Sequence, residues 1–254
     1  PVLLVSAIVA DRVAVAQWGL TRVVAGLVRI MCLQMTLPLA AELGHDRAIG
    51  DRQALRRLYA RGSALVALLA SLVVSGLLAF WQDFFALWTH GAIPYDPLLT
   101  LTLLIGAELV APAILALSYG YYSDRGDLLA RTKGLQLAAF VVLALLLTPW
   151  IGPLGMALAV VSTDLVVQFG LLGIAIMRDT LQRPARHVAF LLLLIALVTA
   201  CGWGLGVVIR AALPMDGLAR LVAECALWSI VVAVVASPLV SERLRAKFAG
   251  MIPS

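Results

Sequence analysis

Long apolar runs recur along the chain, separated by short breaks that carry charged residues, proline or glycine. A transmembrane helix needs about 20 mostly apolar residues to cross about 30 Å of hydrocarbon. Membrane strands would instead show alternating segments of about ten residues, and this sequence has none. The pattern predicts an all-α, polytopic integral membrane helix bundle. We place a partial span at 1–10 and seven complete spans at 13–39, 63–80, 98–121, 134–150, 154–177, 188–209 and 218–240.

The composition excludes a water-soluble domain. Of the 254 residues, 63% are hydrophobic and 13% are charged, against roughly 45–50% and about 25% in soluble domains. The three cysteines lie inside apolar runs and lack the spacing of a metal site or a disulfide framework. Glycine-rich phosphate loops and the nucleophile motifs of hydrolases are also missing. We therefore expect neither an enzyme nor a cofactor or metal site.

Basic residues are divided unevenly between the two sides of the predicted spans. One side holds 14 of the 19 Lys and Arg residues, and the loops of the other side hold only Arg12, Arg210 and Arg220. Loops rich in Lys and Arg face the cytoplasm, so the net charge of +5 indicates orientation and does not imply nucleic acid. The C-terminus is predicted to be cytoplasmic. The basic side comprises Arg47, Arg52, Arg56, Arg57, Arg61, Arg125, Arg131, Lys133, Arg178, Arg183, Arg186, Arg243, Arg245 and Lys247.

Segment 44–62 (GHDRAIGDRQALRRLYARG) is predicted to form a short amphipathic helix on the inner membrane surface. Asp51 is suited to cap its start and Gly62 to stop it. Its basic residues would gain about 1 kcal/mol each near anionic membrane lipids. Two roles remain open for the segment, a solvated loop that carries an orientation signal or a surface that steers lipid.

Two arginines lie near the centre of the span predicted at 13–39. Seven residues separate Arg22 from Arg29, so at 100° per residue they project within about 20° of each other. Trp18 and Thr36 project close to the same face of this helix. A charged side chain at this depth costs at least about 2.5–3.5 kcal/mol unless it faces water or a partner. The stripe should therefore line an aqueous cavity or meet acids on another helix.

Arginine suits a cavity for an anion, because its planar guanidinium binds phosphate in bidentate fashion and stays charged at physiological pH. A cavity with two such groups would favour a phosphate-bearing solute. The alternative is that Arg22 and Arg29 pair with Glu108, Asp164 or Glu224 to hold the bundle together. The two arrangements can coexist as a network that substrate displaces.

The acids at membrane depth suggest three further roles. Glu108 precedes Pro112 by four residues, so its carbonyl loses its helical donor and a kink is expected there. A kink beside such an acid is a candidate gate or proton site, or a proline tolerated by neighbouring helices. Asp164 lies among Ser162, Thr163 and Gln168, which favours hydrogen bonding between helices. Glu224 follows Arg220 by four residues, as in a local ion pair.

Several stretches of sequence carry a family resemblance. The run WGLTRVVAGLVRIMCLQMTLPLAA (18–41) ends in Leu-Pro and is followed by the basic segment GDRQALRRLYARG. The turns TPWIGPLGMALAVV (148–161) and SDRGDLLARTKG (123–134) add proline, glycine and basic positions. Together these resemble the C-terminal half of the oligosaccharide and polysaccharide flippases, which share a superfamily with multidrug extruders and lipid II flippases.

The resemblance implies two pseudo-equivalent helical lobes around a central cavity, working by alternating access in the bacterial inner membrane. The cargo would be an anionic, undecaprenyl-pyrophosphate-linked glycan, and polysaccharide polymerisation and export machinery would be a partner. Residues 1–254 would then form one transmembrane lobe, the C-terminal one, cut within its first helix. Arg22 and Arg29 would fall on its first complete helix, where cavity-lining cations are expected.

A second function stays open within the same superfamily. Glu108, beside Pro112, and Asp164 place acids near the proposed anion site. Acids inside a membrane commonly mark ion pathways. A cation-coupled multidrug or metabolite antiporter is therefore the alternative to a flippase.

Overall fold

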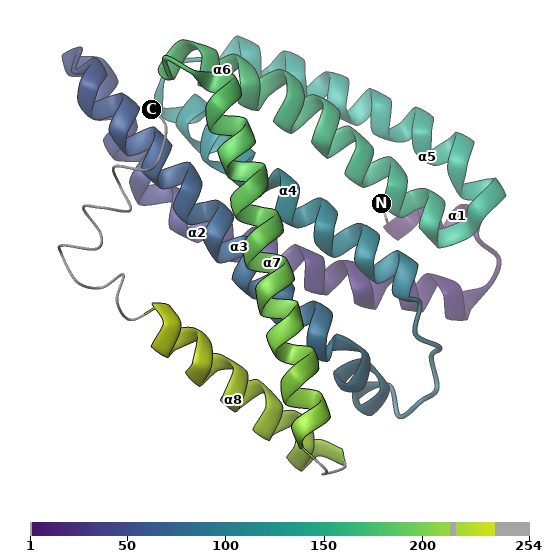
Figure 1. Ribbon diagram of the computed structural model, residues 1–254. Coiled ribbons are helices and arrows are strands. Elements are labelled where there is room, and N and C mark those ends of the chain that lie inside the picture. The colour runs from purple at the N-terminus through teal and green to yellow at the C-terminus, as the bar shows by residue number, and fades with distance from the viewer. Residues whose placement is uncertain (1, 214–216, 237–254) are drawn as a thin grey trace.

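The computed structural model describes residues 2–213 and 217–236, and every regular element within those ranges is a helix. Six of these helices are long and apolar enough to cross a membrane, so the fold is a multi-pass membrane helix bundle. Figure 1 shows α1 (Val2–Ile8), α2 (Arg12–Ile49), α3 (Arg52–Trp88), α4 (Pro97–Tyr122), α5 (Gly126–Thr163), the π-helix η1 (Asp164–Gly173), α6 (Ile174–Thr180), α7 (Pro184–Ala212) and α8 (Gly217–Ala236). Two predicted features lie outside the described residues: the start of the partial span at Pro1 and the end of the span at 218–240. The basic residues Arg243, Arg245 and Lys247 lie outside them as well.

The surface helix predicted at 44–62 is not a separate element. Gly50 ends α2 in the left-handed region at φ 80°, and the Asp51 carboxylate accepts from the backbone N–H of Gln53 and Ala54 to begin α3. The cap at Asp51 is thus confirmed, whereas the stop at Gly62 is wrong. Gly62 lies inside α3, where a Cβ would come within 3.0 Å of Leu115 Cδ2 on α4. Glycine serves here for close packing between helices.

Helices α2 and α3 are longer than the membrane requires. Their 38 and 37 residues correspond to about 55 Å at 1.5 Å per residue, against about 30 Å of hydrocarbon. Figure 1 shows their junction projecting from the bundle at upper left. The charged residues around Gly50 therefore lie on helices that extend beyond the apolar layer.

The helical stretch Gly126–Thr180 folds back on itself. Its 55 residues contain one interruption, at Ile151 (φ −125°, ψ 17°) and Gly152 (φ 58°, ψ −138°). The two arms lie side by side in Figure 1, and a Cβ on Gly155 would meet the backbone of Leu147 and Thr148. We call this element the α5 hairpin, with arms 126–150 and 153–180. The predicted break between 150 and 154 falls on its turn.

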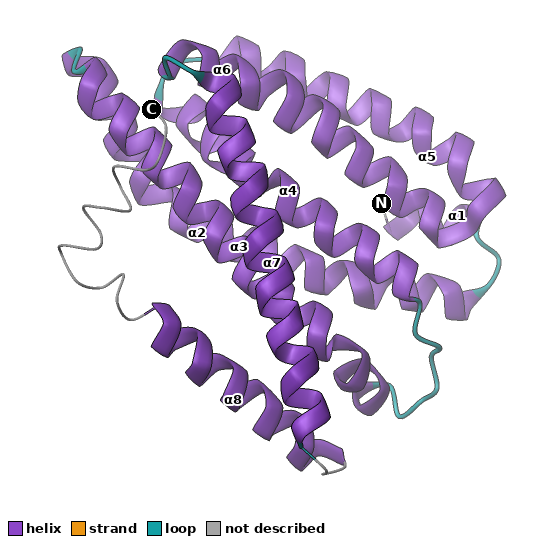
Figure 2. Cartoon of the chain, viewed as in Figure 1, coloured by secondary structure: helices purple, strands orange, loops and turns teal. Residues whose placement is uncertain are grey.

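The connections between helices gather at two ends of the bundle, as the loops in Figure 2 show. Turns 50–51, 123–125 and 181–183 lie at one end, which we call the basic end. There Arg47 Nη1 donates to the Tyr119 hydroxyl at 3.1 Å, and Arg125 pairs with Asp179. Connections 9–11 and 89–96 and the hairpin turn lie at the opposite end.

Two large hydrophobic cores and a smaller one between α3 and α8 hold the described helices together. One large core lies toward the opposite end and the other toward the basic end. Helices α3 and α7 also pack through small residues, since Gly202 faces Ser75 and Gly206 faces Ala79. The first core includes Trp18, Trp81, Phe85, Leu99, Leu104 and Met156, and the second includes Leu43, Tyr59, Tyr119, Ile176, Met177 and Leu191.

Candidate functional site

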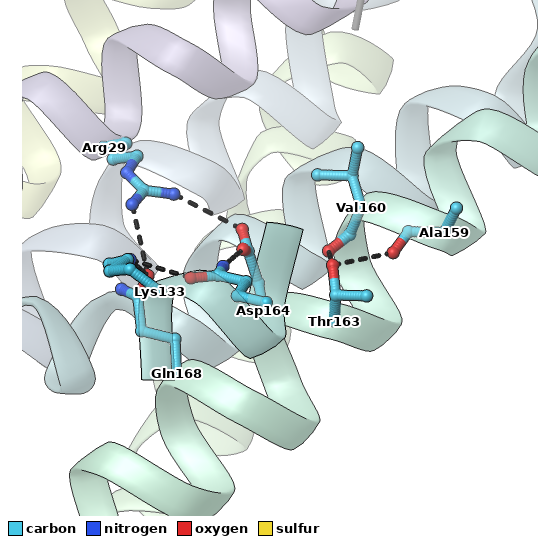
Figure 3. Close-up of polar contacts among 8 residues, drawn as sticks. Arg29, Lys133, Ala159, Val160, Thr163, Asp164 and Gln168 are labelled. Carbon is cyan, nitrogen blue, oxygen red and sulfur yellow. Dashed lines mark hydrogen bonds and ion pairs between the residues drawn. The ribbon is translucent and has the colours of Figure 1, made fainter. Parts of the chain in front are cut away.

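A polar network joins α2 to the second arm of the α5 hairpin. Arg29 on α2 donates through Nη1 to Asp164 Oδ2 at 3.3 Å and through Nη2 to Gln168 Oε1 at 3.2 Å. Both acceptors lie on η1, which begins at Asp164. Figure 3 shows the Arg29 side chain reaching toward these two residues. π-Helical turns occur frequently at functional sites, because they displace side chains from the regular helical positions.

The first arm of the hairpin completes the network. Lys133 Nζ donates to Gln136 Oε1 at 2.8 Å and to Gln168 Oε1 at 2.9 Å, and Gln136 Nε2 donates to Asp164 Oδ1. Three segments distant in sequence therefore meet through side-chain hydrogen bonds, although Gln168 Nε2 is buried without a partner. We call Arg29, Lys133, Gln136, Asp164 and Gln168 the polar cluster.

Arg22 lies on the same face of α2 as Arg29, seven residues before it, and makes a different contact. Its guanidinium carbon is 5.2 Å from the centroid of the Trp18 ring, a cation–π arrangement. Within the described part of the chain no carboxylate forms an ion pair with Arg22. Arg22 interacts electrostatically with Asp164 and Arg29 at longer range. With Lys133, three cations therefore surround one acid, which leaves an excess of positive charge.

Two adjoining cavities border these cations. The first, of about 400 Å³, lies between α2, α4 and the second arm of the hairpin. The second, of about 260 Å³, reaches Lys133 and Gln136 on the first arm. Arg22, Arg29 and Asp164 line both cavities, so the two arginines of the stripe predicted on α2 border open space on two sides.

A third cavity continues from the polar cluster to the basic end. Its volume is about 400 Å³, and its walls include Tyr121 and Asp124 at the α4–α5 turn together with Lys133. Lys133 thus borders both this cavity and the second one. The cations form a row from the middle of the bundle toward the predicted cytoplasmic surface.

Trp18 and Thr36, the other two residues of the predicted stripe, line neither of the cavities that border Arg22. Trp18 is fully buried beneath Arg22 and belongs to the hydrophobic core at the opposite end. Thr36 is also fully buried, and its hydroxyl bonds Leu33 O at 2.9 Å and Ser118 Oγ at 3.0 Å. Thr36 therefore joins α2 to α4 and does not lie in either cavity that borders Arg22.

Glu108 lies apart from the polar cluster. It is fully buried on α4 and accepts a hydrogen bond from Thr199 on α7. Helix α4 continues through Pro112 to Tyr122, so the proline is accommodated without an interruption of the helix. Glu108, Asp164 and Glu224 were the predicted partners of Arg22 and Arg29, and of these three acids only Asp164 forms such a pair, with Arg29. Glu224 pairs with Arg220 at 2.7 Å, as its spacing predicts.

Sequence reasoning missed Lys133 and Gln136 as site residues. The predicted span began at 134, so Lys133 counted as a loop residue, whereas α5 begins at Gly126. The signal was available in the spacing, because Lys133, Gln136 and Phe140 follow one another at three and four residues, as on one helix face. All three line the second cavity.

Comparison of the chain with protein-family models, with curated proteins and with solved structures finds no match.

Proposed function

We propose that this chain forms one lobe of a flippase that moves an anionic, lipid-linked oligosaccharide or polysaccharide precursor across the bacterial inner membrane by alternating access. One observation carries the proposal: Arg22, Arg29 and Lys133 border two adjoining cavities, and among the described residues Asp164 is the only acid that lines either of them. Fixed positive charge at such depth is costly unless a negative ligand or water compensates it.

A phosphate or pyrophosphate group fits these cations chemically. Arginine guanidinium groups bind phosphate oxygens in bidentate fashion, and lysine acts as a point charge. Asp164 and Gln168 occupy the Arg29 donors at 3.3 and 3.2 Å, where they serve as internal substitutes that an incoming phosphate displaces. Arg22 has no such substitute to displace and would make the first contact.

The proposed membrane arrangement follows the distribution of charge. The basic end faces the cytoplasm, the two arms of the α5 hairpin count as separate crossings, and the seven complete spans bring the C-terminus inside. The third cavity then opens from Lys133 toward the side on which a lipid-linked precursor is assembled. A second lobe would close the cavities that α2 borders.

The antiporter alternative is favoured less by the geometry. An acid at the centre of a cation site should line a cavity, and Glu108 lines neither of the cavities that border Arg22. Asp164 does line them, but it is already paired with Arg29. Drug sensitivity after deletion of the gene, with normal surface glycan, would favour the antiporter.

The experiment replaces Arg22 and Arg29 together with glutamine in the intact protein. We expect export of the surface glycan to fall at least about tenfold, because each lost charge-assisted contact weakens anion binding by about 1.5 kcal/mol or more. Export is measured as surface glycan per cell, and membrane levels of the protein are measured alongside.

The matched control replaces Arg183 and Arg186, two exposed arginines at the basic end, with glutamine. This control removes the same charge and leaves the cavities intact, so export should be preserved. Unaltered glycan in the Arg22 and Arg29 variant, at normal protein level, would refute the proposed function.

A further inference from the structure

A groove lies between α3 and α8, away from the polar cluster. Helix α8 packs against α3 and α7 and lies at one edge of the bundle (Figure 1). The groove has a volume of about 340 Å³, and its walls run from Val73 to Phe84 on α3 and from Leu221 to Ser229 on α8. Phe84 and Cys225 in these walls are exposed, so the groove opens to the surroundings of the bundle. We call it the α3–α8 groove.

The walls of the α3–α8 groove are apolar and rich in aromatic rings. Phe80 and Trp81 line it from α3 and Trp228 lines it from α8, and none of the described residues that line it is charged. The Trp228 indole Nε1 donates to Gly202 O on α7 at 2.9 Å, which fixes the ring in place. A Cβ on Gly76 would come within 3.3 Å of the same ring, so the ring lies directly against the α3 backbone. A groove of this kind suits a hydrocarbon chain.

The length of the groove matches one leaflet of a membrane. From Val73 to Phe84 the α3 wall extends about 17 Å at 1.5 Å per residue. One leaflet contributes half of about 30 Å of hydrocarbon, or about 15 Å. Asp83 and the exposed Trp88 place the Phe84 end at the membrane surface, since charged residues and tryptophan favour that level. The groove therefore reaches from the surface at the opposite end to the middle of the bilayer.

A neutral set of charged side chains lies at the surface end of the groove. Asp83 directly precedes the last α3 residue of the walls and pairs with Arg210 of α7. Arg220 directly precedes the first α8 residue of the walls, donates to Arg210 O at 3.2 Å and pairs with the buried Glu224. The side chains of Asp83, Arg210 and Arg220 stay partly exposed. Two acids and two arginines carry no net charge, so this rim complements a headgroup with one charge of each sign.

We propose that the α3–α8 groove binds one zwitterionic phospholipid of the phosphatidylethanolamine type, taken from the leaflet at the opposite end. One acyl chain lies along the aromatic walls, the phosphate accepts from Arg210 or Arg220, and the ammonium group donates to Asp83. Phosphatidylglycerol offers no cation to Asp83, and the choline group of phosphatidylcholine offers it no N–H donor. The inference does not rest on the proposed function, because the groove shares no residue with the cavities around the polar cluster.

The test is native mass spectrometry of the purified full chain in detergent. The chain is incubated with equal amounts of palmitoyl-oleoyl phosphatidylethanolamine, phosphatidylcholine and phosphatidylglycerol, and the lipid retained per chain is measured. We expect retention to saturate at one lipid. Phosphatidylethanolamine should be retained about threefold or more over phosphatidylglycerol, which corresponds to one partly exposed ion pair.

Variants of the walls separate the groove from the rest of the lipid-facing surface. Cys225→Phe places a ring in the groove and should lower retention of phosphatidylethanolamine about tenfold, and Ser229→Leu fills the same wall if Cys225→Phe does not fold. The matched control is Cys201→Phe, which changes an exposed cysteine on α7 outside the groove and should keep retention. Asp83→Asn should keep binding of the chain but remove the preference for phosphatidylethanolamine over phosphatidylcholine.

Three results would overturn the inference. The first is retention of phosphatidylethanolamine that is equal in the parent, Cys225→Phe and Ser229→Leu, and the second is a preference for phosphatidylglycerol. The third is a different occupant: either a polyprenyl phosphate that displaces the phospholipid at equal concentration, or a dimer of the chain that Cys225→Phe dissociates. None of these results bears on the anion site around Arg22 and Arg29, so the two proposals are tested separately.

Discussion

At the residue scale, Asp164 is the carboxylate that determines the net charge of the polar cluster. It accepts from Arg29 and Gln136, and it balances one of the three surrounding cations. Its side chain is 18% exposed and that of Arg29 is 44% exposed, so the pair borders open space. In the proposed function, the Asp164 carboxylate competes with the anionic ligand for Arg29, which makes binding of that ligand reversible.

Replacing Asp164 with asparagine should therefore tighten anion binding. The amide keeps the size of the side chain and removes the competing charge, so affinity for inorganic pyrophosphate should rise about threefold to tenfold. Isothermal titration calorimetry on the purified protein measures it. The matched control is Asp179→Asn, which removes an acid paired with Arg125 at the basic end. Weaker binding by Asp164→Asn would mean that Asp164 orients Arg29 for the ligand.

At the element scale, the sequence predicted helix breaks well and helix lengths poorly. The Pro-Gly signal near 150–154 marks the true hairpin turn, and Asp51 caps α3, because both signals act through the local backbone. Gly62 and Lys133 were misplaced for a different reason. For Gly62, tertiary contacts decide whether a glycine ends a helix or packs against a neighbouring helix. For Lys133, α5 extends on the N-terminal side of its apolar run to Gly126, and hydropathy does not detect this polar turn of the helix.

The hairpin turn should depend on glycine at position 152. Its backbone has φ 58° and ψ −138°, a conformation that side chains with a Cβ rarely adopt, and no atom would crowd a Cβ there. Gly152→Ala should therefore lower stability by about 1–2 kcal/mol through backbone strain alone. Unfolding by denaturant in mixed micelles measures this change.

Gly134→Ala is the matched control for the turn. Gly134 also has free space around it but lies within α5 in regular helical conformation. Alanine favours helix over glycine by about 0.5–1 kcal/mol, so this variant should be as stable as the parent or more stable. Equal effects of the two replacements would show that the turn is not strained.

At the scale of the whole molecule, the alternation of basic and non-basic connections matches the two ends of the bundle. The helix ends that flank the turns at the basic end carry several arginines, while connection 89–96 carries no Lys or Arg. The arrangement in space was not accessible from hydropathy, which cannot say which helices touch. Only the structure shows that α2 meets the α5 hairpin. It also shows that Arg29 and Lys133 donate to the same oxygen atom of Gln168.

Thiol labelling checks the orientation. In a chain whose Cys32, Cys201 and Cys225 are replaced by alanine, Ala92→Cys should react with a membrane-impermeant maleimide added to intact spheroplasts. Gln182→Cys, which is also exposed but lies at the basic end, should react only after the membrane is permeabilised. The reverse pattern would invert the topology and place the third cavity on the outer side.

The division of the apolar interior into two cores has a mechanical consequence. A bundle with one continuous core would have to disrupt it to open toward either side of the membrane. Here the packing around Trp81 and Phe85 and the packing around Tyr59 and Tyr119 belong to different cores. In a flippase of the proposed kind, the packing at one end would loosen while the packing at the other end stays closed, so the solute at the centre would never face both sides of the membrane at once.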